Sequence, residues 1–284
     1  MDDEVGSVGI GLAGTGVAAP ARVRRRVPRT LVHVALPVAG TLAFFALLEL
    51  VVRSGMVVRQ AMPPPTEIAH ALGSIVVTGR FWSSVGRTLE GWALGLGLAA
   101  IAAIPIGLIV GTNRWLYRSL RFVIDFLRPI PSVALIPLFI LVFGINLSLK
   151  TYLVAIGAFW PLFFQTTYGV QDVDPVARDT AHAYRLNRVF RFVFVSLPGA
   201  TPYIATGLRI SASIALLLAV GTEMVVGLPG LGRDIFKAQY ASDANRTYAL
   251  IVASGLLGIL IALGFSRLER WVLRWHPSQR EVAE

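Results

Sequence analysis

The chain has 284 residues, of which 55% are apolar and 15% are charged, and it contains no cysteine. So little polar surface cannot cover a soluble globule, and the lack of cysteine excludes a disulfide framework. The formal net charge of +10 needs no nucleic-acid partner, because basic residues that flank membrane spans and meet anionic headgroups account for it.

Residues 1–30 contain many Gly, Ala and Arg residues and show little periodicity, which predicts a disordered tail. Apolar runs of about 20 residues, the length that crosses the hydrocarbon core of a bilayer, follow this tail. They are Leu31–Val52, Leu89–Val110, Phe122–Phe143, Thr151–Val170, Pro202–Glu223 and Tyr248–Phe265. We therefore predict an all-α polytopic membrane protein with about six transmembrane helices. Its membrane domain is expected over residues 31–270, between cytoplasmic tails over residues 1–30 and 271–284.

The second run contains glycines at four-residue spacings, which allow a neighbouring helix to approach its backbone closely. These glycines are Gly91, Gly95, Gly107 and Gly111. Ordinary helix packing and a role in gating are alternative interpretations of this pattern.

Prolines interrupt the third run at Pro129, Pro131 and Pro137. Each proline removes an amide donor and pushes the chain away from a straight helix. Such breaks survive in a membrane only where protein or a water-filled cavity satisfies the freed carbonyls. A place beside a translocation path and a simple structural kink are therefore both open.

A polar, Arg-rich stretch, Asp179 to Pro198, separates the fourth and fifth runs and reads DTAHAYRLNRVFRFVFVSLP. Its polarity and its place between long apolar segments indicate a docking element for a partner at the membrane surface. We call residues 171–200 the polar segment.

Several ionisable residues lie in or near the predicted spans, where charges are costly and often functional, and we single out three of them. Arg128 lies near a span end, where hydration offers a structural alternative. Arg209 is early in the fifth span, and snorkelling to the cytoplasmic interface is its alternative role. Glu223 ends that span, where it would hold an outer gate, with Arg233 as one possible partner, or remain a hydrated interfacial residue. Together with the three prolines, these residues are our candidates for a translocation path or gate.

Basic residues around the spans indicate the orientation of the chain. If the N-terminus is cytoplasmic, the inner segments at 22–29, 114–121, 178–191 and 267–280 carry twice as many Arg and Lys residues as the outer segments at 53–87, 150 and 233–246. This bias predicts a multi-pass protein of the plasma (inner) membrane with both termini and the polar segment in the cytoplasm.

The polar segment resembles the EAA loop of ABC-importer permeases, with Asp179, Thr180 and Ala181 in the places of its acidic-Ala-Ala triplet. From about Pro64 to Trp275 the chain is similar to the sulfonate, taurine and nitrate permease family. The further motifs that carry this resemblance are Arg128 to Leu138, Phe143-Gly144, Gly207-Leu208-Arg209, Glu223 and Gly230-Leu231-Gly232. One departure is Arg185, which stands where the family's loop usually has Gly and leaves the geometry of that turn open.

The resemblance implies a type I ABC-importer permease fold, in which the polar segment sits in a groove of a cytoplasmic ATPase. The residues that it assigns to ATPase coupling are Asp179, Thr180, Ala181, Arg185, Leu186, Arg188, Leu197 and Pro198. Implied partners are cytoplasmic ABC ATPase subunits, an extracytoplasmic solute-binding protein and a second permease copy, in a surround of membrane lipid. The permease itself would be no enzyme, and it would move a small, often anionic solute such as a sulfonate, taurine or nitrate inward by alternating access.

An ion-driven secondary transporter is the alternative function, but neither inverted halves nor mid-span acidic residues are evident. An intramembrane enzyme is a second rival. The histidines are scattered, and no Ser-His, paired-Asp or HExxH arrangement appears. The Gly-rich stretch Gly227 to Gly232 lacks the strand and βαβ unit of a dinucleotide site. We therefore predict no catalytic residue, metal site or cofactor in this chain.

Overall fold

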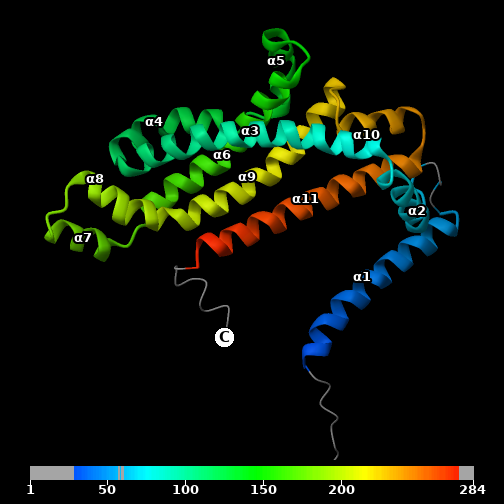
Figure 1. Ribbon diagram of the computed structural model, residues 1–284, viewed down its shortest axis with the longest axis horizontal. Coiled ribbons are helices and arrows are strands. Elements are labelled where there is room, and N and C mark those ends of the chain that lie inside the picture. The colour runs from blue at the N-terminus through cyan, green and yellow to red at the C-terminus, as the bar shows by residue number, and fades with distance from the viewer. Residues whose placement is uncertain (1–28, 57, 59–60, 275–284) are drawn as a thin grey trace, which may run out of the picture. The chain divides into compact units, whose positions relative to one another are not determined.

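A computed structural model describes residues 29–56, 58 and 61–274, and the secondary structure in these ranges is helical (Figure 1). The α-helices are α1 (Arg29–Arg53), α2 (Pro65–Val76), α3 (Gly79–Thr112), α4 (Arg114–Leu127), α5 (Ile136–Phe143), α6 (Leu147–Gln171), α7 (Pro175–Ala183), α8 (Arg188–Arg191), α9 (Leu197–Val226), α10 (Leu231–Tyr240) and α11 (Ala244–Val272). A 3₁₀ helix, Ser132–Leu135, precedes α5, and a π-helical turn, Phe192–Ser196, joins α8 to α9.

The chain divides into two compact units, Met1–Leu47 and Leu48–Glu284, with the division inside α1. In the first unit the described part is the start of α1. Most of the predicted tails, 1–30 and 271–284, lies outside the described residues. Where those ranges are described they are helical at Arg29 and Thr30, in α1, and at Trp271 and Val272, in α11, and a turn follows at Leu273 and Arg274.

Five helical segments of the described chain are long and apolar enough to cross a membrane: Leu36–Arg53, Gly79–Thr112, Leu147–Gln171, Arg188–Val226 and Ala244–Val272. A sixth span results if α4 and the segment Ser132–Phe143 are counted as one helix pair bent by 76°. The predicted all-α polytopic architecture with about six spans is confirmed.

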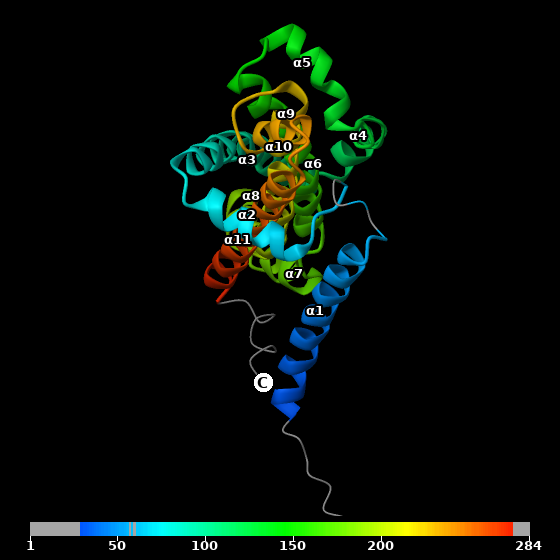
Figure 2. The same cartoon turned by 90° about the vertical axis from the view of Figure 1, so that its right-hand side faces the viewer.

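The bend lies at Arg128–Pro131, where the sequence predicted a break. Pro129 and Pro131 lack amide donors, and their rings obstruct a continuous helix. Pro137 behaves differently from the prediction: it occupies the first turn of α5, where a missing amide costs nothing, so it starts a helix there. In Figures 1 and 2, α5 projects away from the bundle of α3, α6 and α9.

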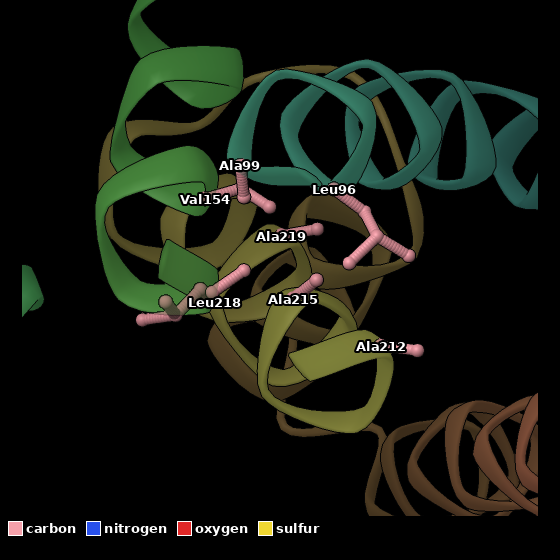
Figure 3. Close-up of a cluster of buried hydrophobic side chains, with 8 residues drawn as sticks. Leu96, Ala99, Val154, Ala212, Ala215, Leu218 and Ala219 are labelled. Carbon is pink, nitrogen blue, oxygen red and sulfur yellow. The ribbon is translucent and has the colours of Figure 1, made fainter. Parts of the chain in front are cut away.

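The core of the second unit is built where α3, α6 and α9 lie side by side (Figures 1 and 2). Small and branched side chains from the three helices meet there, as Figure 3 shows for Leu96 and Ala99 of α3, Val154 of α6 and Ala215 of α9. Small residues at such contacts let helix backbones come close in a membrane, where dispersion contacts drive association.

The glycine spacing in α3 is explained by its contact with α6. A Cβ atom on Gly107 would lie 2.8 Å from Thr166 Cβ, and one on Gly111 would lie 2.9 Å from Val170 Cβ. Gly91 and Gly95 face Lys150 and Val154 of α6 in the same way. Close packing is therefore the role that the structure gives to these glycines.

Candidate functional site

The polar segment contains two short helices, α7 and α8, and each is started by a side-chain cap. Asp174 accepts a hydrogen bond of 2.8 Å from the Val176 amide at the start of α7, and Asn187 accepts one of 2.8 Å from Phe190 at the start of α8. Such caps satisfy amides that have no partner within the helix. The Arg178 guanidinium donates to the carbonyl oxygens of Val170 and Gln171, which holds α7 against the end of α6.

Arg185 occupies the turn between α7 and α8 with φ +52°, in the left-handed region. The Leu186 amide donates to the Ala181 carbonyl at 3.1 Å, and the Arg185 amide donates to the His182 carbonyl at 2.9 Å. These bonds form a Schellman cap, a motif that usually ends on glycine because glycine bears no Cβ penalty at positive φ. The turn thus keeps the geometry that glycine favours, despite the arginine.

Not all of the predicted coupling residues point outward. Asp179, Thr180, Arg185 and Arg188 are exposed, whereas the Ala181 side chain is buried within this chain. Leu197 and Pro198, predicted to close the loop, form the first turn of α9 instead. A charge introduced at Ala181 would therefore disturb the segment itself before it reached a partner.

Large apolar side chains of α7, α8 and the turn between them are also exposed, and we call these residues the exposed apolar patch: Val176, Tyr184, Leu186, Val189 and Phe190. Of these residues only Leu186 was predicted from sequence, because the arginines dominate the pattern of this stretch. The signal was present as apolar residues interleaved with arginines. Exposed apolar groups of this kind, rimmed by charges, are typical of a protein interface.

A basic cavity of about 1080 Å³ opens beside the polar segment, between it and the junction of α3 with α4. Its lining includes Arg114 and Arg118 of α4 and Arg178, Arg188 and Arg191 of the polar segment. Positive charge is therefore concentrated at the end of the bundle where the polar segment lies.

The opposite end of the bundle holds a buried ionic network around Glu223, in place of the hydrated position considered from sequence. Lys150 Nζ lies 3.0 Å from Glu223 Oε1, and the Thr88 hydroxyl donates to Oε2 at 2.9 Å. The Gly232 amide donates to the same oxygen at 3.1 Å, while the Leu231 amide donates to Thr88. The predicted partner Arg233 is wrong, since Lys150 makes the ion pair.

Burial makes the two charges of this network costly to desolvate. Lys150 and Glu223 are each at most 2% exposed, and the ammonium also donates to the Arg87 carbonyl at 2.8 Å. Desolvating two charges is offset only when hydrogen bonds satisfy both groups, as they do here. The network joins α3, α6 and α9 to the start of α10, so it fixes the place of α10 at this end of the bundle.

Arg209 does not act through snorkelling alone, because its guanidinium lies 3.2 Å from Glu269 of α11. The same carboxylate accepts a hydrogen bond from Thr206. Arg209 and Glu223 are about 21 Å apart along α9 at 1.5 Å per residue, so these two path candidates belong to separate places.

Arg128 is exposed at the bend that follows α4, and its guanidinium lies 4.7 Å from the centre of the Phe164 ring of α6. This is a cation–π contact. The candidate residues thus form four groups: the polar segment, the Arg128 bend, the Arg209–Glu269 pair and the Glu223 network.

The protein family described as binding-protein-dependent transport system inner membrane component matches residues 103–275. The putative aliphatic sulfonates transport permease protein SsuC of Escherichia coli is 33% identical over 79% of this chain and 85% of its own length. The bicarbonate transport system permease protein CmpB of Synechococcus elongatus is 32% identical over 69% and 70%, and the taurine transport system permease protein TauC of Escherichia coli is 29% identical over 76% and 80%.

Solved structures share the fold. An inward-facing MetNI methionine ABC transporter aligns with a TM-score of 0.60 and 20% identity, covering 66% of this chain and 94% of that one. An amino acid ABC transporter crystallised with histidines aligns with a TM-score of 0.56 and 19% identity, over 72% and 97%. The multi-pass helical fold is therefore that of type I ABC-importer permeases, and the chain belongs to the family of binding-protein-dependent transport system inner membrane components.

Proposed function

We propose that this chain is the permease subunit of an ATP-driven ABC importer that moves a small anion inward across the plasma membrane. The observation that carries this proposal is the pairing of the family match with a polar segment that exposes capped short helices at one end of the bundle. ATP hydrolysis is assigned to separate cytoplasmic ATPase subunits. A second permease copy and an extracytoplasmic solute-binding protein complete the proposed complex.

A continuous helical segment links the proposed ATPase-binding end of the chain directly to the membrane spans. From Arg188 to Val226, α8, the π-helical turn and α9 form one helical segment. A displacement of α8 by the ATPase therefore moves α9, which packs against α6 and α3 in the core. Interfaces of this kind switch between discrete arrangements, as alternating access requires.

We assign an outer latch to the Glu223 network. It ties the far end of α9 to α10, so movement of α9 reaches α10 through the network. Helix α10 exposes Phe236 and Tyr240, which we assign to contact with the solute-binding protein. The positive-inside bias supports cytoplasmic termini and a cytoplasmic polar segment, with α10 outside.

The substrate proposal draws on the solutes that the relatives are named for, which include aliphatic sulfonates, bicarbonate and taurine. In this chain an exposed cation, Arg128, lies at the helix bend. A positive charge there would favour the passage of an anion.

The variant Tyr184→Asp tests the proposed coupling. It places a charge in the exposed apolar patch, where burial against a partner without a counter-ion is unfavourable, so the ATPase subunit retained on the purified chain should fall at least tenfold. The matched control is Tyr240→Asp on α10, because Tyr184 and Tyr240 are 77% and 86% exposed at opposite ends of the bundle. The control should retain the ATPase fully. Equal ATPase retention by both variants would contradict the assignment of the polar segment.

A further inference from the structure

The basic cavity beside the polar segment lies where two apolar runs of the chain end. The apolar runs of α3 and α6 end at Val110 and Val170, and the lining of the cavity includes Gly111 and Val170 at these ends. The ends of apolar runs that cross a bilayer lie close to the lipid headgroups. The cavity is therefore close to the layer in which lipid phosphates lie.

Positive charge exceeds negative charge on the walls of this cavity. The lining contains a single carboxylate, that of Asp179, and five guanidinium groups. In the described ranges none of the five arginines forms an ion pair with an Asp or Glu. Because like charges that share a cavity repel one another, an anion bound among them is favoured. The five arginines are Arg114, Arg118, Arg178, Arg188 and Arg191.

Two of these arginines differ in how the protein holds them. The Arg178 guanidinium donates to the carbonyl oxygens of Val170 and Gln171, which fixes its place in the wall. The Nε atom of Arg191 is buried and has no hydrogen-bond partner within the described part of the chain. A donor without an acceptor is unfavourable, and the planar guanidinium fork suits the oxygens of a phosphate. Arg191 is thus able to turn toward an oxyanion in the cavity.

An apolar strip leads away from the cavity along α4. Trp115 belongs to the lining and is 78% exposed, and the exposed rings of Phe122 and Phe126 follow about two and three turns further along the same face. Tryptophan is enriched at membrane–water interfaces. A helix that combines arginines with an exposed apolar face is typical of the boundary between headgroups and acyl chains.

The cavity and the strip together fit an amphipathic anion. An inorganic phosphate ion, or an acidic side chain of a protein partner, would meet the arginines and leave the apolar strip uncovered. A phospholipid covers both, because its phosphate accepts charge-assisted hydrogen bonds and its acyl chains gain free energy against the aromatic rings. Basic pockets between membrane helices bind anionic headgroups in this way.

We propose that the basic cavity binds the phosphate group of one anionic phospholipid, whose acyl chains lie along Trp115, Phe122 and Phe126. The headgroup then joins α4 to the polar segment, with Arg118 on one wall and Arg191 on the other. This lipid site does not depend on the proposed transport function.

Native mass spectrometry of the full-length chain in detergent tests the site, with dioleoyl phosphatidylglycerol and dioleoyl phosphatidylcholine as probes. The wild type is expected to bind phosphatidylglycerol at least tenfold more tightly, because the ammonium group of choline is repelled by the arginines. Arg191→Gln and Arg118→Gln are each expected to weaken phosphatidylglycerol binding at least tenfold, since each removes a charge-assisted hydrogen bond. Arg118 is exposed, so its variant tests the site even if Arg191→Gln does not fold.

Arg121→Gln is the matched control, because Arg121 is an exposed arginine of the same helix that pairs with Asp125 at 3.5 Å and lies outside the lining. It should bind phosphatidylglycerol within twofold of the wild type. Equal losses in Arg118→Gln and Arg121→Gln would overturn the proposal, since they would show a diffuse attraction to charge.

Two competitors test for other occupants of the cavity. The lipid is expected to stay bound when inorganic phosphate is added at the same concentration, and also when the ATPase subunits are added. Displacement by phosphate would assign the cavity to a soluble anion, and displacement by the ATPase would assign it to acidic side chains of that partner. Either result would overturn the proposal, as would a wild type that retains no more phosphatidylglycerol than Arg118→Gln does.

Discussion

Lys150→Met is expected to lower the free energy of unfolding by about 3 to 5 kcal/mol, because it leaves the Glu223 carboxylate buried without its counter-ion. The loss should appear as a lower midpoint in thermal unfolding of the purified chain. The double variant Lys150→Met, Glu223→Gln should recover a large part of that stability, since it removes both charges and keeps a side chain that bonds to Thr88 and Gly232.

Arg87→Met is the control for this ion pair. Its guanidinium lies 3.3 Å from Glu90, but the two side chains are 62% and 40% exposed, in contrast to the buried pair. Exposed pairs contribute about 0 to 1 kcal/mol, so this variant should unfold close to the wild type. Equal losses in Arg87→Met and Lys150→Met, or a double variant as unstable as Lys150→Met, would refute the structural importance of the buried pair.

Gly107→Leu is expected to destabilise the bundle by at least about 1 to 3 kcal/mol, the range for overpacked cores. A Cβ atom there would already lie 2.8 Å from Thr166 Cβ and 3.0 Å from the Phe163 carbonyl oxygen, and the rest of a leucine has no space between α3 and α6. Thermal unfolding of the purified variant measures the loss.

Gly97→Leu serves as the control, because a Cβ on this glycine of α3 meets no atom within 4 Å. Leucine favours helix more than glycine by somewhat under about 1 kcal/mol, so Gly97→Leu should be as stable as the wild type or more so. If the Gly107 and Gly97 variants unfold alike, the close approach of α3 and α6 is not what stabilises the bundle.

Patterns local in sequence predicted much of this fold. The apolar runs gave the spans, the prolines at 129 and 131 gave the bend, and the glycine spacing of α3 gave a close helix contact. The angle of the bend and the partner of α3 depend on packing between distant segments. Neither can be obtained from the spacing of residues along one helix.

The buried network escaped prediction because its members are far apart in the sequence. Lys150 and Glu223 are separated by 73 positions, and Thr88 and Glu223 by 135. A lysine at the start of an apolar run is ordinarily a hydrated loop residue, and only the tertiary contact places it inside the protein. The same reasoning applies to Arg209, whose partner Glu269 belongs to another helix.

The backbone conformation of Arg185 also could not be predicted from the sequence. An arginine predicts no positive φ, and only the Schellman bonds to Ala181 and His182 require it. The sequence also did not show which residues of α7 are buried. The triplet Asp179, Thr180 and Ala181 matches a motif, but in the helix Ala181 is buried and the two residues before it are exposed.

The energy source of transport tests the central proposal most directly. The experiment uses proteoliposomes that contain the chain with its ATPase and solute-binding subunits. Radiolabelled hexane-1-sulfonate or taurine is added on the face of the membrane where α10 lies. We predict accumulation only when ATP is supplied on the side of α7 and α8, and no accumulation when a proton or sodium gradient replaces ATP. Uptake driven by an ion gradient without ATP would contradict an ABC permease and establish a secondary transporter.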